Sequence, residues 1–398
     1  MEKNNLELSI RLSTLTIFRN LLKDPVIKSL QELLTLADEG KNMQHNVSAY
    51  SKCVAYLYET GPNLSQYILE LVLNDENFYI KKKAAGKKIS STVENCLDAE
   101  LALLQMLVGL KSDTIKKALN YHEFLPAWEN SDCDIVGEYK KRLADLPHHG
   151  FGIFAKYHTF TLKGSKIVPI KYPDSQQIDQ LFGYEPEREK ILKNTLALID
   201  EKGCNNMLLY GDAGTGKSST IKAIANELGN QGLRLIEVKK NQLYQIPDIV
   251  EELSASPLKF ILFIDDLSFT NNDDNFSALK AILEGSVSTG GDNIVIYATS
   301  NRRHLVKETM SDRTGNELHV NDTLQETMSL ASRFGLTITF QKPDKEEYLY
   351  IVDKLAIKYG VELDNNKLHI KAEAHAIRNN GRSPRVAKQF IELLKSGI

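Results

Sequence analysis

Apolar residues recur at helical spacing from the start of the chain to about residue 145. A helical run from Asn46 stops at Gly61-Pro62, and further runs cover Leu64 to Leu73 and Val93 to Leu110. The earliest repeats are Leu8, Leu12, Leu15 and Leu22, then Val26, Leu30, Leu33 and Ala37. This spacing, with a glycine-proline break between runs, predicts an all-α N-terminal domain over residues 1–150.

The helical pattern ends at the segment PHHGFG, which spans Pro147 to Gly152. Apolar and polar residues then alternate from Tyr157 to Ile170, on both sides of Lys163-Gly164-Ser165. Alternation on both sides of a glycine turn predicts a β-hairpin. We therefore expect a linker with a hairpin over residues 151–174.

Strand-like and helical patterns alternate from residue 175 to residue 342. The strand-like segments are Asn206 to Tyr210, Arg234 to Val238, Phe260 to Ile264, Asn293 to Ala298 and Gly335 to Phe340. Alternation of this kind predicts an α/β domain in which helices sandwich a parallel sheet. After Pro343 the pattern is helical again, which predicts a small helical C-terminal subdomain over residues 343–398.

Composition and charge narrow the class of protein. The chain has 398 residues, 42% of them hydrophobic, and a net charge of −3, which suits a soluble protein of two or three domains without general attraction to nucleic acid. A basic run from Lys81 to Lys88 could meet nucleic acid or an acidic partner, although a solvated loop or helix end explains it better. The four cysteines are far apart, and no signal peptide or membrane span is evident, so we expect a cytoplasmic protein with reduced thiols.

One short segment carries the strongest chemical signal. Gly211, Gly216, Lys217 and Ser218 have the G-x-x-x-x-G-K-[ST] spacing, between an apolar strand and an amphipathic helix. Glycines allow backbone N–H groups to surround phosphate oxygens, the lysine adds a positive charge, and the serine hydroxyl can bind Mg²⁺. The segment therefore predicts a site for a nucleoside triphosphate.

Polar residues at the ends of two later strands fit the same site. Asp265 and Asp266 close an apolar strand, so the first carboxylate could hold Mg²⁺ and the second could orient or deprotonate the attacking water. Ser300 and Asn301 close the next strand and could contact the γ-phosphate and this water, or could cap the segment that follows. Arg333 and the segment GRSPR, which ends at Arg385, offer guanidinium groups suited to a phosphoryl-transfer transition state, although a surface salt bridge is the usual role of a single arginine.

The ordered motifs FGY, GDAGTGKS, FILFIDDL, ATSN, ASRFGLTI and GRSPRVAKQF resemble the core of an AAA+ ATPase. In detail they are similar to the uncharacterised bacterial ATP-binding family called domain of unknown function 815. The resemblance covers residues 150 to 398. It implies a P-loop α/β domain at 175–342, a helical lid at 343–398, ATP and Mg²⁺ as cofactors, and assembly with copies of the same chain.

The resemblance also implies a role for each matching residue. Ser218 and Asp265 would serve the metal, Asp266 would complete the Walker B pair, and Asn301 would be sensor 1. Arg385 would be sensor 2 in the lid, and Arg333 would be an arginine finger acting on a neighbour's ATP, with Arg302, Arg303 and Arg313 as alternatives. The nucleotide would contact Gly211, Asp212, Ala213, Gly214, Thr215, Gly216, Lys217, Ser218 and Ser219. The segment from Leu181 to Tyr184, which includes Phe182 and Gly183, would lie against the adenine.

Two departures from the AAA+ pattern affect these expectations. Asp266 stands where most AAA+ motors have glutamate, which implies slow hydrolysis. Members that thread peptides carry an aromatic residue, an apolar residue and a glycine after the second strand, which Asn241 to Gln245 lack. We therefore expect Tyr244 to lie in the core or at an interface.

Three functions remain open from the sequence. The first is an ATP-hydrolysing remodeller whose N-terminal helical domain selects a protein client. The second is a switch that assembles on ATP and scarcely hydrolyses it, and the third is a loader for DNA replication or repair. A GTPase is disfavoured because no N-K-x-D sequence follows the P-loop. A small-molecule kinase is disfavoured by the extra strand before Walker B and by the lid.

Overall fold

The computed structural model of the chain describes residues 2–39, 43–119, 121–268, 274–283, 292–301, 332–379 and 381–397. The chain divides into two compact units, Met1–Lys156 and Tyr157–Ile398. Each unit has its own hydrophobic core and is described by itself.

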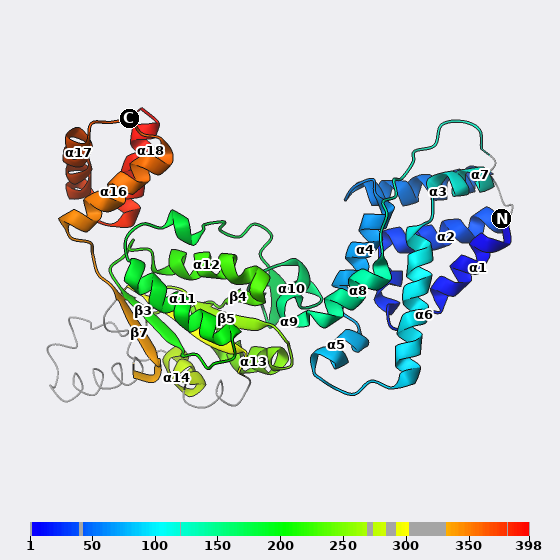
Figure 1. Ribbon diagram of the computed structural model, residues 1–398, viewed down its shortest axis with the longest axis horizontal. Coiled ribbons are helices and arrows are strands. Elements are labelled where there is room, and N and C mark those ends of the chain that lie inside the picture. The colour runs from blue at the N-terminus through cyan, green and yellow to red at the C-terminus, as the bar shows by residue number, and fades with distance from the viewer. Residues whose placement is uncertain are drawn as a thin grey trace. The chain divides into compact units, whose positions relative to one another are not determined.

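All named elements of the first unit are helices, as far as the structure describes it (Figure 1). Its helices are α1 (Glu2–Ser13), η1 (Arg19–Lys23), α2 (Pro25–Glu39), α3 (Met43–Tyr58), α4 (Leu64–Asn74), α5 (Phe78–Ala84), α6 (Ser91–Val108), α7 (Ser112–Leu119), α8 (Ile135–Ala144), α9 (Leu146–His149) and α10 (Ile153–Lys156). Buried leucines at the predicted positions, among them Leu12, Leu30 and Leu33, form one core. The prediction of an all-α N-terminal part is confirmed.

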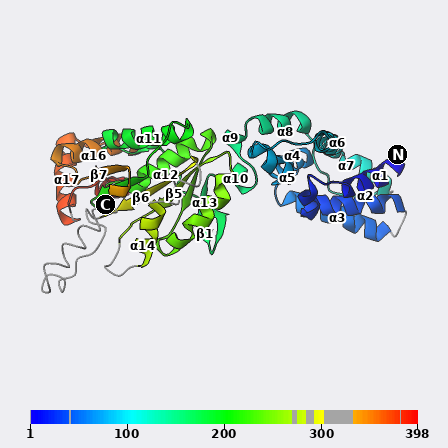
Figure 2. The same ribbon diagram turned by 90° about the horizontal axis from the view of Figure 1, so that it is seen from below.

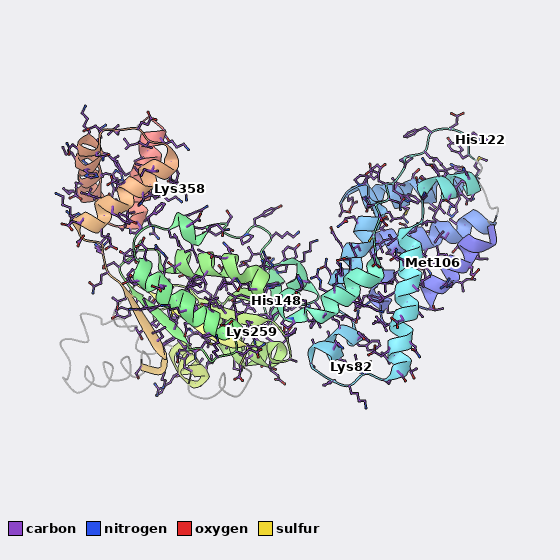
Figure 3. The ribbon with its side chains drawn as sticks, in the orientation of Figure 1. Lys82, Met106, His122, His148, Lys259 and Lys358 are labelled. Atoms are coloured by element: carbon purple, nitrogen blue, oxygen red, sulfur yellow. The ribbon has the colours of Figure 1, made fainter. Side chains whose placement is uncertain are left out.

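Polar caps explain where several of these helices begin. The side chain of Asn63 accepts a hydrogen bond from the backbone of Gln66, and Asn77 accepts one from Ile80. Such caps satisfy N–H groups that have no partner within the helix. The lysine run begins in the last turn of α5, where Lys81 pairs with Glu76 at 2.7 Å and Lys82 is exposed (Figure 3). These lysines therefore lie at a helix end and in the turn after it.

The second unit contains a seven-stranded sheet in the order β2-β1-β4-β5-β6-β3-β7. The strands are β1 (Thr159–Lys163), β2 (Lys166–Pro169), β3 (Met207–Gly211), β4 (Leu233–Glu237), β5 (Lys259–Ile264), β6 (Ile294–Ser300) and β7 (Leu336–Phe340). All neighbouring strands are parallel except β1 and β2, which form an antiparallel hairpin. Because β1 pairs with β4, the hairpin extends the main sheet.

Helices cover both faces of this sheet. Figure 2 shows α11 (Glu185–Ile199) and α12 (Lys217–Leu228) along one face, and α13 (Ile246–Ser254) and α14 (Asp274–Ala281) along the other. Ile191 of α11 and Ile221 of α12 share a core with Leu209 of β3. The predicted α/β architecture, a mostly parallel sheet sandwiched by helices, is confirmed.

Three helices follow β7 and form a small C-terminal part, which we call the lid. They are α16 (Lys345–Tyr359), α17 (Asn365–Arg378) and α18 (Pro384–Lys395), and they share a separate core around Tyr348, Ile351 and Phe390. Ser383 accepts a hydrogen bond from the backbone of Val386 and so caps α18. The small helical C-terminal part is therefore also confirmed. Across the described residues, no helix combines the length and apolar character needed to cross a membrane.

Candidate functional site

The loop between β3 and α12 depends on glycine. Gly211, Gly214 and Gly216 have φ values of 138°, 80° and 93°, a region that residues with a side chain rarely adopt. At Gly211 a Cβ atom would lie 2.0 Å from the carbonyl oxygen of Phe340 on β7. The loop leads directly into α12, whose free N–H groups and positive dipole end favour an anion.

Lys217 occupies the first position of α12 and is only 5% exposed. Its Nζ donates hydrogen bonds to the carbonyl oxygens of Gly211, at 2.9 Å, and Asp212, at 2.7 Å. It donates a third to Oδ1 of Asn301, at 3.0 Å. Burial lowers the pKa of Lys217 below its usual value, and the nearby carboxylates of Asp212, Asp265 and Asp266 offset part of this shift. The ammonium group is thus held among neutral acceptors that phosphate oxygens could replace.

A hydrogen-bond network surrounds the carboxylate of Asp265. Ser218 Oγ and Thr299 Oγ1 each donate to Oδ1 of Asp265 at 2.6 Å. The hydroxyl of Thr299 also accepts a bond from the backbone N–H of Asp266, at 3.0 Å. The geometry therefore places a serine hydroxyl beside a carboxylate, and Mg²⁺ sites commonly combine one or two carboxylates with phosphate oxygens and water.

Asp266 and Asn301 contact each other across neighbouring strand ends. Nδ2 of Asn301 donates to Oδ1 of Asp266 at 2.8 Å, and its Oδ1 accepts the bond from Lys217. Asp266 has a φ of 52°, which is uncommon for a residue with a side chain and needs support from its surroundings. Ser300 is fully buried and donates to the carbonyl of Leu267. Asn301, the residue after β6, therefore contacts Lys217 and Asp266, whereas Ser300, the last residue of β6, bonds to the backbone.

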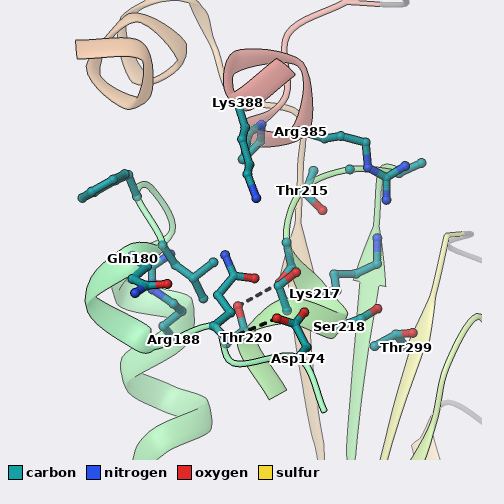
Figure 4. Close-up of a pocket in the computed structure, with 18 of the residues that line it drawn as sticks. Asp174, Gln180, Arg188, Thr215, Lys217, Ser218, Thr220, Thr299, Arg385 and Lys388 are labelled. Carbon is teal, nitrogen blue, oxygen red and sulfur yellow. Dashed lines mark hydrogen bonds between the residues drawn. The ribbon is translucent and has the colours of Figure 1, made fainter. Parts of the chain in front are cut away.

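These residues line a cavity of about 540 Å³ (Figure 4). The predicted residues that line it are Leu181, Phe182, Ala213, Gly214, Thr215, Gly216, Lys217, Ser218, Ser219, Asp265, Asp266, Asn301 and Arg385. Gly211, Asp212, Gly183 and Arg333 are not among the lining residues that the structure describes. Asp212 instead joins the loop to the end of β7, because its Oδ2 accepts a bond from the backbone of Lys342 at 3.1 Å.

The lid meets the loop at the start of α18. The backbone N–H of Arg385 donates to the carbonyl of Gly214 at 3.2 Å, and Arg385 lines the cavity. Arg382 instead forms a double hydrogen bond with Glu373 of α17, at 2.9 and 2.6 Å. Of the two arginines in GRSPR, Arg385 is therefore the one at the cavity.

Arg333 lies just before β7 and is half-buried, next to the buried Phe334. It is not among the described residues that line the cavity. The alternatives Arg302, Arg303 and Arg313 lie outside the described residues.

Several lining residues were not predicted as part of the site. They are Asp174, Gln176, Gln180, Arg188, Thr220, Thr299, Ile351, Leu355, Pro384 and Lys388. Lys388 follows Arg385 by three positions on α18, so helical spacing could have indicated it. Thr299 belongs to the ATSN motif and could also have been noticed. No comparable signal identifies Gln176, Gln180 or Arg188.

Known proteins resemble part of this chain. Relatives include RuvB, a "Holliday junction branch migration complex subunit" of Phytoplasma mali, which is 22% identical over 49% of this chain and 54% of its own length. The "ATP-dependent Clp protease ATP-binding subunit ClpL" of Staphylococcus aureus is 22% identical over 50% of this chain and 34% of its own length. This chain thus spans about half, or less, of the length of these relatives.

Among solved structures, RuvB of Thermotoga maritima has a TM-score of 0.38 at 18% identity, covering 55% of this chain and 64% of that one. AMPPCP-bound DnaA of Aquifex aeolicus has a TM-score of 0.41 at 17% identity, covering 57% and 67%. A family model described as "Protein of unknown function (DUF815)" matches residues 154–398, which include the whole cavity. The chain therefore belongs to the family with that description.

Proposed function

We propose that this protein binds Mg-ATP and hydrolyses it to ADP and phosphate. The observation that carries the proposal is one connected network, in which Ser218 bonds to Asp265 and Asn301 bonds to both Lys217 and Asp266. It joins the phosphate loop to the ends of two neighbouring strands. The ClpL relatives are named as ATP-binding subunits, which supports the same proposal.

Binding would use the two ends of the cavity differently. The loop and Lys217 would hold the β- and γ-phosphates, and Ser218 with Asp265 would hold Mg²⁺, which supplies charge neutralisation when bound. Phe182 at the other end would lie against the base, and Arg385 would reach the nucleotide from the lid. The apolar side chains Ile351 and Leu355 line the same cavity and suit a base rather than phosphate.

Hydrolysis would depend on the two residues that could position water. The oxygen of water attacks the γ-phosphorus, and the bond between that phosphorus and the bridging oxygen of ADP breaks. Asp266 would orient the water and accept its proton, and Asn301 would hold Asp266 and Lys217 in place. The shorter aspartate side chain leads us to expect slow turnover.

The mutational test compares two variants. We expect Lys217→Ala to lose nucleotide binding and hydrolysis together, since it removes the cation of the phosphate loop. We expect Asp266→Asn to keep ATP bound and to lose turnover by roughly 100-fold or more, in the range seen when a general base is removed. Radiolabelled ATP binding and phosphate release measure the two properties separately.

The exposed Lys202→Ala variant is the matched control for loss of a lysine, and it should behave as the parent does. Hydrolysis by Lys217→Ala or Asp266→Asn at the parent's rate would refute the assignment. Asp266→Asn should also trap a bound protein client, which we expect the N-terminal helical unit to select.

The second candidate is an ATP-dependent assembly switch, which Arg333 favours because it lies outside the cavity of its own chain. In this proposal Arg333 contacts ATP held by a second copy. Light scattering should show a larger mass with Mg-ATP than with ADP, and Arg333→Ala should reduce that difference. Equal masses of the parent in both nucleotides would exclude assembly through Arg333.

A further inference from the structure

The base end of the cavity contains a turn with an unusual backbone. Phe182 lines the cavity, and the next two residues, Gly183 and Tyr184, have φ values of 77° and 61°. Two consecutive left-handed residues are uncommon, more so when one is a large aromatic residue. Such a turn needs contacts that favour it over an ordinary backbone.

Two side chains of α11 form hydrogen bonds with the backbone N–H and the carbonyl oxygen of Gly183. Oε1 of Glu185 accepts the N–H of Gly183 at 3.0 Å, and a guanidinium N–H of Arg188 donates to the carbonyl of Gly183. The same Oε1 pairs with Nη2 of Arg188 at 3.2 Å. We call Glu185 and Arg188 the Gly183 clamp.

Arg188 is buried to an unusual degree for an arginine. It is 7% exposed, and its pKa is lowered chiefly by this burial. It also lines the cavity, and Figure 4 places Arg188 and Gln180 on the side opposite Ser218 and Thr299. The clamp therefore lies at the base end, away from the phosphate loop.

The other side of the turn contacts the lid. A Cβ atom on Gly183 would lie 2.8 Å from Cδ1 of Ile351 on α16, so the turn packs closely against this helix. The hydroxyl of Tyr184 donates to the carbonyl of Gln341, between β7 and α16. The carboxylate of Glu347, in the first turn of α16, also lies beside this turn, 3.4 Å from the position of a Cβ atom on Gly183. One turn thus touches the cavity on one side and the lid on the other.

We propose that Arg188, together with Glu185, is a positioning residue that makes the lid respond to the base of the nucleotide. The inference rests on the proposed function, since it concerns the same ATP site. With the clamp in place, a base against Phe182 meets a turn already fixed against α16. Without Arg188 the buried carbonyl of Gly183 loses its donor, the turn relaxes, and Phe182 and the lid lose their common support.

The two ends of the cavity make this proposal testable. Inorganic tripolyphosphate with Mg²⁺ can occupy the phosphate loop but has no base, whereas Mg-ATP occupies both ends. A general structural defect would weaken both ligands, whereas loss of the clamp should weaken only the ligand that has a base.

The experiment measures both affinities by titration calorimetry on the full chain, with Arg188→Met, Arg188→Lys, Glu185→Gln and the control Lys190→Met. Lys190 is an exposed cation on the same helix. We expect Arg188→Met to bind Mg-ATP about tenfold or more weakly, because it removes a buried charge-assisted hydrogen bond. The affinity of Arg188→Met for Mg-tripolyphosphate should stay within about twofold of that of the parent. The affinities of Lys190→Met for both ligands should stay within the same range.

Hydrogen exchange measures the coupling to the lid. ATP should slow the exchange of backbone amides in α16 in the parent and in Lys190→Met, and should do so much less in Arg188→Met. Tripolyphosphate should give the parent little of this protection. Arg188→Lys should restore part of it, because lysine keeps the charge but cannot reproduce the guanidinium geometry.

Two results for Arg188→Met would overturn the proposal. One is an equal loss of affinity for both ligands, and the other is unchanged affinity for ATP with unchanged protection of α16. If Arg188→Met does not fold, Glu185→Gln decides the question, because the Glu185 side chain is 56% exposed. That variant should also weaken ATP selectively, and parent-like behaviour would overturn the proposal. A parent that binds neither ligand would instead refute the proposed ATP site itself.

Discussion

Thr299 joins the two acidic residues that follow β5. Its hydroxyl donates to Asp265 and accepts from the backbone of Asp266, so one side chain orients both. The register of the sheet explains this position, since Ile264 lies opposite Ala298 and the next residues are therefore neighbours. Thr299 consequently acts on the proposed metal site through Asp265.

We predict that Thr299→Val raises the Mg²⁺ concentration needed for half-maximal ATP hydrolysis by roughly tenfold. Valine keeps the shape but removes a hydrogen bond to a charged group, which is worth about 1.5–3 kcal/mol. Thr195→Val is the matched control, because Thr195 is also buried and its hydroxyl bonds to Ile191 and Tyr297, away from the cavity.

Both valine variants should unfold at lower urea concentration than the parent, since each loses a buried hydrogen bond. Only Thr299→Val should change the dependence of hydrolysis on Mg²⁺. The same Mg²⁺ dependence in the two variants would show that the hydroxyl of Thr299 does not orient Asp265.

The sequence predicted which motif residues line the cavity better than it predicted their hydrogen-bond partners. Lys217, Asp265 and Asn301 each follow a recognisable motif, and the structure brings them together as expected. Arg188 carries no such signal, because an arginine on an amphipathic helix usually lies at the surface. Its contact with Gly183 depends on a turn that spacing alone does not reveal.

At the scale of elements, the central strands were predicted within two residues of their observed bounds. Their apolar runs are continuous because both faces are buried, as in Lys259–Ile264, where every residue is buried. The order β4-β5-β6-β3-β7 could not be predicted in the same way. Pairing joins segments far apart in the chain, and periodicity carries no information about which strands become neighbours.

The hairpin shows the same difference between local and distant information. Alternation around Gly164 indicated two strands with a turn, which is a local property, and β1 pairs with β2 as that pattern indicates. The parallel pairing of β1 with β4 is a long-range contact that the pattern did not indicate.

Tyr244 was expected to lie in the core or at an interface. It is 66% exposed in η4 (Lys240–Gln245), so it does not belong to the core of its own chain.

At the scale of the whole molecule, the chain consists of two units with separate cores. Leu12, Leu30 and Leu101 belong to the core of Met1–Lys156, whereas the described residues that line the cavity belong to Tyr157–Ile398. A ligand stabilises the unit that binds it and leaves an independent unit unchanged. Separate cores therefore lead us to expect two unfolding transitions, of which one responds to nucleotide.

We predict that calorimetry of the full chain resolves these two transitions and that Mg-ATP moves only one of them. At a concentration 100-fold above the dissociation constant, binding contributes about 2.7 kcal/mol, which should raise the midpoint of a unit of this size by about 5 to 10 °C. In Lys217→Ala both midpoints should stay fixed on adding Mg-ATP, because that variant lacks the cation of the phosphate loop. A shift of both transitions in the parent would mean that the helical unit is coupled to the nucleotide site, and a single transition would mean that the two units unfold together. The two results have different consequences for client binding. An independent N-terminal unit can bind a client without altering the affinity for ATP. A coupled unit must alter the affinity for ATP by the same free energy with which ATP alters the affinity for the client.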